Sequence, residues 1–306
     1  MKNTCRNIFL TGGTGFIGTR LTQMLIKRGH RLVIATRHPE RYANTDRIKH
    51  VLFSRDSSAH FEEVLSGCDV VINLAGESLF GKRWTPAVKK RLYDSRVETT
   101  RMLVEAMEMA EKKPELFVSC SAAGYYGNRG DLKLAEHSEP GSDFLAMICR
   151  DWEKASAKAT EMSVRVVNPR IGIALGAEGG ALSAMLPVFR SYLGGSIGHG
   201  SQYFPWIHIR DLCHGLLYLM DNEQLEGPFN ISAPNPVTMD EFSGALGRAL
   251  GRPSIFRVPE WALKGVLGEA SAMLTGSLRM IPKGLQEAGF VFEHDNLDSA
   301  LKDLFP

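Results

Sequence analysis

Residues 8–18 read Ile-Phe-Leu-Thr-Gly-Gly-Thr-Gly-Phe-Ile-Gly, and this stretch decides the fold. A short apolar strand runs into glycines, and an amphipathic helical pattern follows them. In such a strand, turn and helix, Gly12 permits the tight turn, Gly15 lets a pyrophosphate approach the backbone, and Gly18 lets the helix pack on its strand. The order predicts a dinucleotide site at the positive end of the helix. The alternative is a glycine-rich turn without a ligand.

Composition places few limits on function. The chain has 306 residues, 44% of them hydrophobic and 23% charged, which suits one large α/β domain with a smaller appendage. A net charge of +2 gives no reason to expect a nucleic acid or an anionic membrane as partner. No apolar run approaches the roughly 18 residues of a membrane span. We therefore expect a cytoplasmic protein, and composition says nothing more about its function.

The five cysteines are odd in number and dispersed, and they form no CxxC pair. This pattern argues against a disulfide scaffold and against a zinc site, and it suits a reducing compartment. We predict no metal site.

The end of the second strand predicts which dinucleotide is bound. Residues 31–36 form a buried strand that ends at Arg37, about 20 residues beyond the glycines, where a dinucleotide site usually reads the ribose. An acid there would bind the 2′-hydroxyl of NAD, whereas a guanidinium suits a 2′-phosphate. The sequence thus favours NADP(H). In the alternative, Arg37 is a solvated charge, and Glu40 or Asp46 reads the ribose.

Other predicted strands end in small and polar residues, as the first two strands do at the glycine turn and at Arg37. A fourth strand ends in Asn-Leu-Ala-Gly-Glu at 73–77, and a fifth ends at Ser121, followed by Ala-Ala-Gly-Tyr-Tyr-Gly. A sixth strand, 164–167, leads into Asn-Pro-Arg, and one long helical pattern runs from 84 to 112. The carboxyl ends of parallel strands are where ligands bind in a doubly wound sheet.

The element order predicts an α/β fold: a Rossmann-type, doubly wound parallel sheet with a smaller, mostly helical C-terminal substrate lobe. We expect residues 1–168 to form the NADP-binding domain, to which a strand and helix around 203–231 return. Residues 169–202 and 232–306 are expected to form the substrate lobe. The apolar faces of the long helices leave open whether the protein is a monomer or a homodimer.

Taken together, the motifs resemble the extended short-chain dehydrogenase/reductase family. The matching stretches are TGGTGFIG at 11–18, NLAGE at 73–77, SR at 95–96, SAAGYYG at 121–127 and FPWIHI at 204–209. More narrowly, the chain resembles the atypical, NAD-dependent epimerase/dehydratase-like branch whose members are called epimerase family proteins. The resemblance covers essentially the whole chain.

The resemblance implies NADP(H) contacts at the glycine turn, at three strand ends and at one helical arginine. These residues are Gly12, Thr14, Gly15, Phe16, Ile17, Gly18, Thr36, Arg37, Leu74, Ala75, Gly76, Arg96, Pro169 and Arg170. It also implies that the nicotinamide lies near Ser121 and residues 169–170. Arg96 suits this role because a cation beside the crevice can donate charge-assisted hydrogen bonds to phosphates. The alternative for Arg96 is a salt-bridged surface.

The chain departs from the family at the catalytic pair. The family carries Tyr and Lys in a YxxxK pattern, in which the lysine binds the ribose and lowers the pKa of the tyrosine. Here Cys149 stands at the tyrosine position and Glu153 at the lysine position. A free thiol has a pKa of about 8.5, and a neighbouring carboxylate raises it where the lysine would lower it. The usual proton relay is absent.

Three residues remain as candidates for catalysis. Ser121 is expected to polarise the substrate oxygen, and Tyr126 or Cys149 to exchange the proton, with Tyr125 as a further possibility. The sequence thus predicts an oxidoreductase or epimerase that acts on a small carbonyl or sugar-like compound. One alternative is an NADPH-binding sensor or interaction module without turnover, and another is a cofactor that only stabilises the fold.

Overall fold

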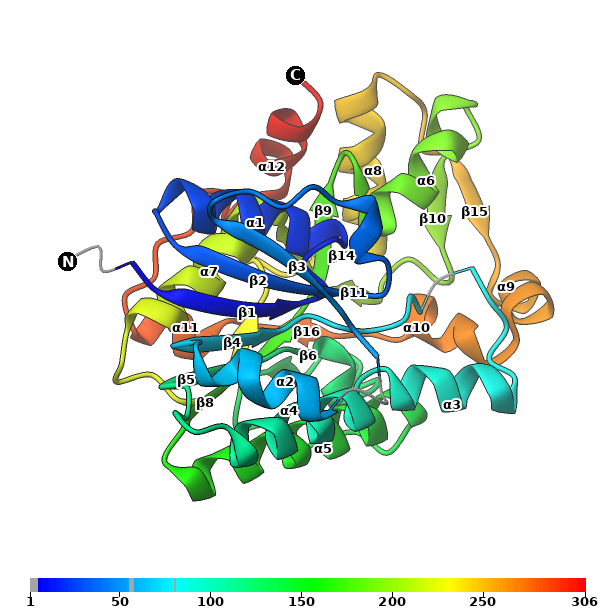
Figure 1. The fold of residues 1–306 in the computed structure, drawn as a ribbon. Coiled ribbons are helices and arrows are strands. Elements are labelled where there is room, and N and C mark those ends of the chain that lie inside the picture. The colour runs from blue at the N-terminus through cyan, green and yellow to red at the C-terminus, as the bar shows by residue number, and fades with distance from the viewer. Residues whose placement is uncertain (1–4, 55–57, 80) are drawn as a thin grey trace.

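The computed structural model describes residues 5–54, 58–79 and 81–306. The strands of its central sheet are β1 (Asn7–Thr11), β2 (Arg31–Thr36), β3 (Ile48–Leu52), β4 (Val70–Asn73), β5 (Leu116–Ser119), β6 (Ser121–Ala122), β8 (Arg165–Ile171) and β13 (Gly227–Ile231). They lie in the order β3-β2-β1-β4-β5-β8-β13, with β6 beside β8 (Figure 1). Every pairing in this sheet is parallel. The predicted Rossmann-type fold is confirmed.

Helices cover both faces of this sheet because successive strand residues point to opposite sides. Ile8 and Leu10 of β1 pack in one core under α1 (Phe16–Lys27) and α7 (Ile209–Asp221). Phe9 packs in the other core. The helices of that layer are α2 (Ser58–Ser66), α4 (Val97–Met109) and α5 (Phe144–Ala157) (Figure 1). The two layers leave the carboxyl edge of the strands open.

Short elements, most of them from the second half of the chain, lie beside that edge (Figure 1). The strands pair as β9 (Ile173–Gly176) with β12 (Trp206–His208), β11 (Tyr203–Phe204) with β14 (Val237–Thr238), β10 (Gly195–Ile197) with β15 (Phe256–Val258), and β7 (Lys133–Leu134) with β16 (Arg279–Met280). The α-helices are α6 (Gly180–Arg190), α8 (Met239–Leu250), α9 (Glu260–Leu267), α10 (Ala272–Thr275), α11 (Lys283–Glu287) and α12 (Leu297–Leu304). Short 3-10 turns span Pro39–Arg41, Ala123–Tyr126, Lys158–Met162 and Gly268–Ser271.

Two predicted elements differ from the structure. The helix predicted over 84–112 is two helices, α3 (Pro86–Asp94) and α4, which are interrupted at residues 95–96. The strand predicted over 164–167 continues to Ile171, because β8 pairs with β13 from Val167 onward. Pro169 is tolerated inside this strand because β5 pairs only as far as Val167 and β6 pairs from residue 170.

Within the described residues, no helix combines the length and the apolar character needed to cross a membrane. All five cysteines are free thiols, and four of them are buried.

Candidate cofactor and substrate site

The turn after β1 requires glycine at two positions. Gly12 has a φ of +69°, and a Cβ there would lie 2.7 Å from the carbonyl oxygen of Leu74. The amide of Gly15 donates to the carbonyl of Gly12 at 3.0 Å and closes the turn. A Cβ on Gly18 would lie 2.1 Å from that same carbonyl oxygen, so α1 packs directly on the turn.

The space in front of Gly15 is open. Among the described atoms, a Cβ on Gly15 would meet only the Gly12 oxygen, at 3.3 Å. Thr14, Gly15 and Phe16 line an open cavity of about 590 Å³. Gly15 is also the N-cap of α1, and no side chain in the described part of the chain caps this helix. Its first amides can therefore donate to an anion, and the turn fits the pyrophosphate of NADP(H).

The end of β2 offers a cation to the ribose end of a dinucleotide. Thr36 is buried, and its hydroxyl accepts a hydrogen bond from the amide of His38 at 3.4 Å. Arg37 is exposed, and the described residues provide it with no ion pair. Arg41, by contrast, lies 3.9 Å from Glu40. Arg37 is the side chain that suits a 2′-phosphate here.

Arg96 lies where α3 and α4 meet, because the helix is interrupted there. Its Nη2 donates to the carbonyl of Glu77 at 3.0 Å, and its Nη1 to the carbonyl of Leu92 at 3.2 Å. A Cβ on Gly76 would lie 3.1 Å from the guanidinium, so glycine at that position makes room for it. The structure thus places Arg96 beside the residues that follow β4, where its guanidinium is bound to two backbone carbonyls.

The residue in place of the family lysine is held by a buried arginine. Both oxygens of Glu153 are bound by Arg170, with Nε at 2.9 Å and Nη2 at 2.8 Å. The hydroxyl of Ser121 donates to Glu153 Oε1 at 2.7 Å. The Arg170 side chain is 3% exposed and that of Glu153 is 15% exposed. Glu153 is therefore neutralised, and Arg170 is engaged inside the protein and is not directed at a ligand.

Tyr126 is completely buried at the other end of this cluster. Its hydroxyl donates to Asn230 Oδ1 at 2.6 Å and accepts from Arg170 Nη1 at 3.0 Å. Burial raises the pKa of Tyr126 to about 12. Tyr126 does not line the cavity of about 530 Å³ that we call the substrate cavity. The Tyr125 ring stacks on the Arg170 guanidinium at 3.4 Å. The structure does not bring either phenol to the place where the sequence hypothesis needed a proton donor.

Cys149 is the one residue of the predicted catalytic set that lines the substrate cavity. Its thiol lies 3.7 Å from the carbonyl oxygen of Ala122, to which it donates. Burial first, and the Glu153 carboxylate second, raise the pKa of Cys149 to about 12. The thiol is therefore protonated at neutral pH, a state in which it can donate a proton and is a poor nucleophile.

The substrate cavity has a volume of about 530 Å³ and lies between the sheet edge and the second half of the chain. Phe16, Ile17 and Arg96 line it on the cofactor side, and Ala122 and Cys149 stand beside them. Its remaining wall includes Phe204, Met273 and Leu278. A cavity of this size is typical of a small-molecule site.

Sequence reasoning missed how Glu153, Arg170 and Asn230 connect. Glu153 and Arg170 are 17 residues apart in the sequence, and Tyr126 is 104 residues from Asn230. The sequence contained one usable signal: a charged residue inside a strand that is otherwise apolar requires a buried counter-charge. Glu153, on the helix that packs beside that strand, was the available carboxylate.

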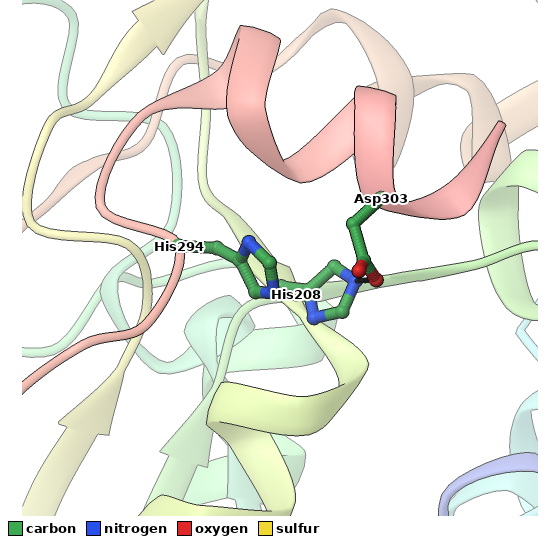
Figure 2. A group of neighbouring side chains, drawn as sticks. All are labelled: His208, His294 and Asp303. Atoms are coloured by element: carbon green, nitrogen blue, oxygen red, sulfur yellow. Dashed lines mark ion pairs between the residues drawn. The ribbon is translucent and has the colours of Figure 1, made fainter. Parts of the chain in front are cut away.

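A second polar cluster lies outside the substrate cavity, where α12 meets the start of α7. Figure 2 shows His208, His294 and Asp303 facing one another. The Nδ1 of His208 accepts the amide of Arg210 at 3.2 Å and caps α7. Neutral His208 must then carry its proton on Nε2, which lies 3.4 Å from Asp303 Oδ2. In this tautomer His208 caps α7 with Nδ1 and faces Asp303 of α12 with Nε2, so the cluster forms a contact between these two helices.

The buried His208 predicts a loss of stability in acid. Burial, followed by the neighbouring His294, lowers the pKa of His208 from 6.5 to about 4. The folded state therefore binds this proton less readily than the unfolded state. Its stabilising contribution is complete above pH 6.5 and falls by up to about 3 kcal/mol as the pH drops towards 4. Urea unfolding from pH 7.5 to 4.5 should show a shallower decline for His208→Asn, which keeps a capping group, than for the parent protein. Equal slopes would contradict this assignment.

Comparisons with known proteins agree with this geometry. Residues 8–232 match the NAD dependent epimerase/dehydratase family, and residues 258–304 match a domain of unknown function, DUF1731. An epimerase family protein of Staphylococcus aureus is 37% identical over 300 residues, which cover 98% of this chain and 99% of that protein. A chloroplastic homologue of epimerase family protein SDR39U1 from Arabidopsis thaliana is 36% identical and is covered over 87% of its length.

Two solved structures are similar to this one. Human epimerase family protein SDR39U1, determined with NADPH, is 34% identical with a TM-score of 0.87, and the match covers 97% of this chain and 98% of that chain. A nucleoside-diphosphate sugar epimerase from Corynebacterium glutamicum is 29% identical with a TM-score of 0.79, and the match covers 99% of this chain and 59% of that chain.

Proposed function

Because the chain belongs to the NAD-dependent epimerase/dehydratase family, we propose that it is an NADP(H)-dependent oxidoreductase acting on a small carbonyl or alcohol compound. One observation carries this proposal: a single cavity joins the first residues of α1, Phe16 and Ile17, to a protonated thiol and to a hydrophobic wall. The NADPH in the human relative supports the choice of cofactor.

In such a reaction, some residues of the chain bind the cofactor and others act on the substrate. When bound, NADPH supplies the hydride. The α1 amides bind the pyrophosphate, and Arg37 binds the 2′-phosphate. Cys149 gives its proton to the oxygen of the carbonyl group as the carbon is reduced to an alcohol, and solvent then reprotonates the thiolate. Ser121 is held by Glu153, so its oxygen is fixed beside the strand end.

The decisive experiment combines binding with turnover. Calorimetric titration with NADPH is followed by mixing the complex with a panel of aldehydes and ketones while nicotinamide absorbance is recorded. Cys149→Ala should keep its affinity for NADPH and slow turnover by roughly 100-fold, because a positioned general acid contributes on that scale. Tyr126→Phe should leave turnover unchanged, because its hydroxyl does not reach the cavity. An unchanged rate in Cys149→Ala would refute the role of the thiol.

The second candidate function is an NADPH-binding sensor without turnover. The observation that favours it is the pairing of Glu153 with Arg170, which leaves the lysine position of the family without a free cation. NADPH binding with no oxidation by any member of the panel would favour the sensor.

Arg37 predicts a preference for the phosphorylated dinucleotide. Arg37→Asp should weaken NADPH binding by roughly 10- to 100-fold, because it removes charge-assisted hydrogen bonds of about 1.5–3 kcal/mol. NADH binding should weaken far less. Arg41→Asp is the matched control, since Arg41 is exposed and lies near Glu40. Calorimetry with both dinucleotides checks the change, and an unaltered preference in Arg37→Asp would contradict it.

A further inference from the structure

Apolar side chains from distant parts of the chain build the wall of the substrate cavity. Trp84 and Phe144 meet edge to face with their ring centroids 5.6 Å apart. Leu145 stands on the same helix as Cys149, and Met273 and Leu278 line the wall from the segment near the C-terminus. A ligand in this space exchanges water for hydrocarbon over most of its surface, which is favourable only for apolar groups.

The charged side chains that line the cavity are mostly carboxylates, one of which, Glu269, is paired with Lys89, so a phosphorylated substrate would find few partners there. Among the described residues that line it, Arg96 is the one cation, and its guanidinium donates to two backbone carbonyls on the cofactor side. The other charged lining residues are carboxylates: Asp143, Glu260 and Glu269. A diphosphate needs arginines, lysines or free backbone amides as partners.

Several helices begin at the cavity, and the starts of three of them are capped, covered or occupied by an acid: α5, α6 and α9, which carries Glu260 in its first turn. The side chain of Asp143 caps α5 by accepting the amide of Ala146 at 2.9 Å. The Phe16 ring covers the start of α6, since a Cβ on Gly179 or Gly180 would lie 2.6 or 2.9 Å from that ring. A helix start that is capped, covered or acidic is a less favourable site for a phosphate.

The side-chain amide groups in the wall form hydrogen bonds within the protein. Gln202 is buried, and its side-chain nitrogen donates to the carbonyls of Ile197 and Leu274 while its oxygen accepts the amide of Gly200. The side-chain oxygen of Asn128 accepts the amide of Ser277 at 3.1 Å. These groups hold the wall together and are not arranged around the hydroxyls of a sugar.

We propose that the substrate is an uncharged, largely apolar carbonyl compound and not a nucleoside diphosphate sugar. This inference rests on the proposed oxidoreductase function, because it names the substrate class of the same site. It separates this chain from the C. glutamicum protein, whose name specifies a nucleoside-diphosphate sugar. The Cys149 thiol is the group in the cavity that would meet the carbonyl oxygen of such a compound.

Direct binding to the NADPH complex tests the proposal without requiring turnover. The probes are prodan, an uncharged naphthyl ketone whose emission rises in apolar surroundings, and UDP-glucose. Prodan should bind with enhanced, blue-shifted emission, and millimolar UDP-glucose should neither bind by calorimetry nor displace it. Binding of UDP-glucose in preference to prodan would overturn the proposal.

A matched pair of variants locates the probe. Met273→Glu places a carboxylate in the cavity wall at a partly exposed position, so it should weaken prodan binding at least tenfold and leave NADPH affinity unchanged. Met109→Glu makes the same change at a 48% exposed position at the end of α4 and should change neither. Equal prodan binding in both variants would overturn the proposal. Failure to bind NADPH would instead refute the proposed function.

Discussion

Arg170→Met is expected to lower the free energy of unfolding by about 3–5 kcal/mol, the range found when one partner of a buried ion pair is removed. The change leaves the Glu153 carboxylate buried with only the Ser121 hydroxyl as a hydrogen-bond donor. It also removes a donor from the oxygen of Tyr126. Urea unfolding at pH 7 measures the loss.

Arg257→Met is the matched control for this change. Arg257 also binds both oxygens of a carboxylate, those of Asp240, at 2.9 and 3.1 Å. Both side chains of that pair are 48% exposed, so removing it should change the free energy of unfolding by about 1 kcal/mol or less. The double variant Arg170→Met, Glu153→Gln should recover part of the loss because it removes the unpaired charge. Equal losses in Arg170→Met and Arg257→Met would contradict our account of the pair.

Gly15→Val should weaken NADPH binding by roughly 1,000-fold, since a branched side chain over the α1 amides excludes several phosphate hydrogen bonds of about 1.5–3 kcal/mol each. The fold should survive, because the added Cβ meets only one described atom, at 3.3 Å. Calorimetry measures the affinity, and a circular dichroism melt checks the fold.

Two further glycine variants separate binding from folding. Gly265→Val is the matched control: among the described atoms, nothing lies within 4 Å of a Cβ at that position, and NADPH affinity should not change. Gly18→Val should instead destabilise the whole domain, because its Cβ would lie 2.1 Å from a backbone oxygen. Retained affinity in Gly15→Val would show that the turn is structural only.

The sequence predicted those features of the fold that depend on short-range pattern. The glycine turn, the apolar strands around it and the helix that follows are each specified within about 20 residues, so they were predictable. The division between α3 and α4 was not, because Ser95 and Arg96 are ordinary helix residues and the apolar period continues across them. The full length of β8 depends on its pairing with β13, which local pattern does not reveal.

The sequence allowed us to predict individual residues of the candidate site but not the contacts between them. Cys149 and Glu153 were identified as departures from a motif, and the structure places Cys149 in the cavity. The sequence did not reveal that Tyr126 turns away to Asn230 or that Arg170 neutralises Glu153. These contacts join residues on different elements, and only the tertiary fold specifies them.

The Glu153–Arg170 pair also restricts how this chain can evolve. A lone Glu153→Lys change, which restores the family lysine, would place two cations within hydrogen-bond distance in a buried site. A lone change at Arg170 leaves the Glu153 carboxylate buried without its partner. Whichever of the two positions changes first, the single variant is therefore destabilised. The two positions are thus epistatic, and lineages should keep both or exchange both together. Restoring the tyrosine–lysine pair would thus require a compensating change at Arg170 besides those at Cys149 and Glu153.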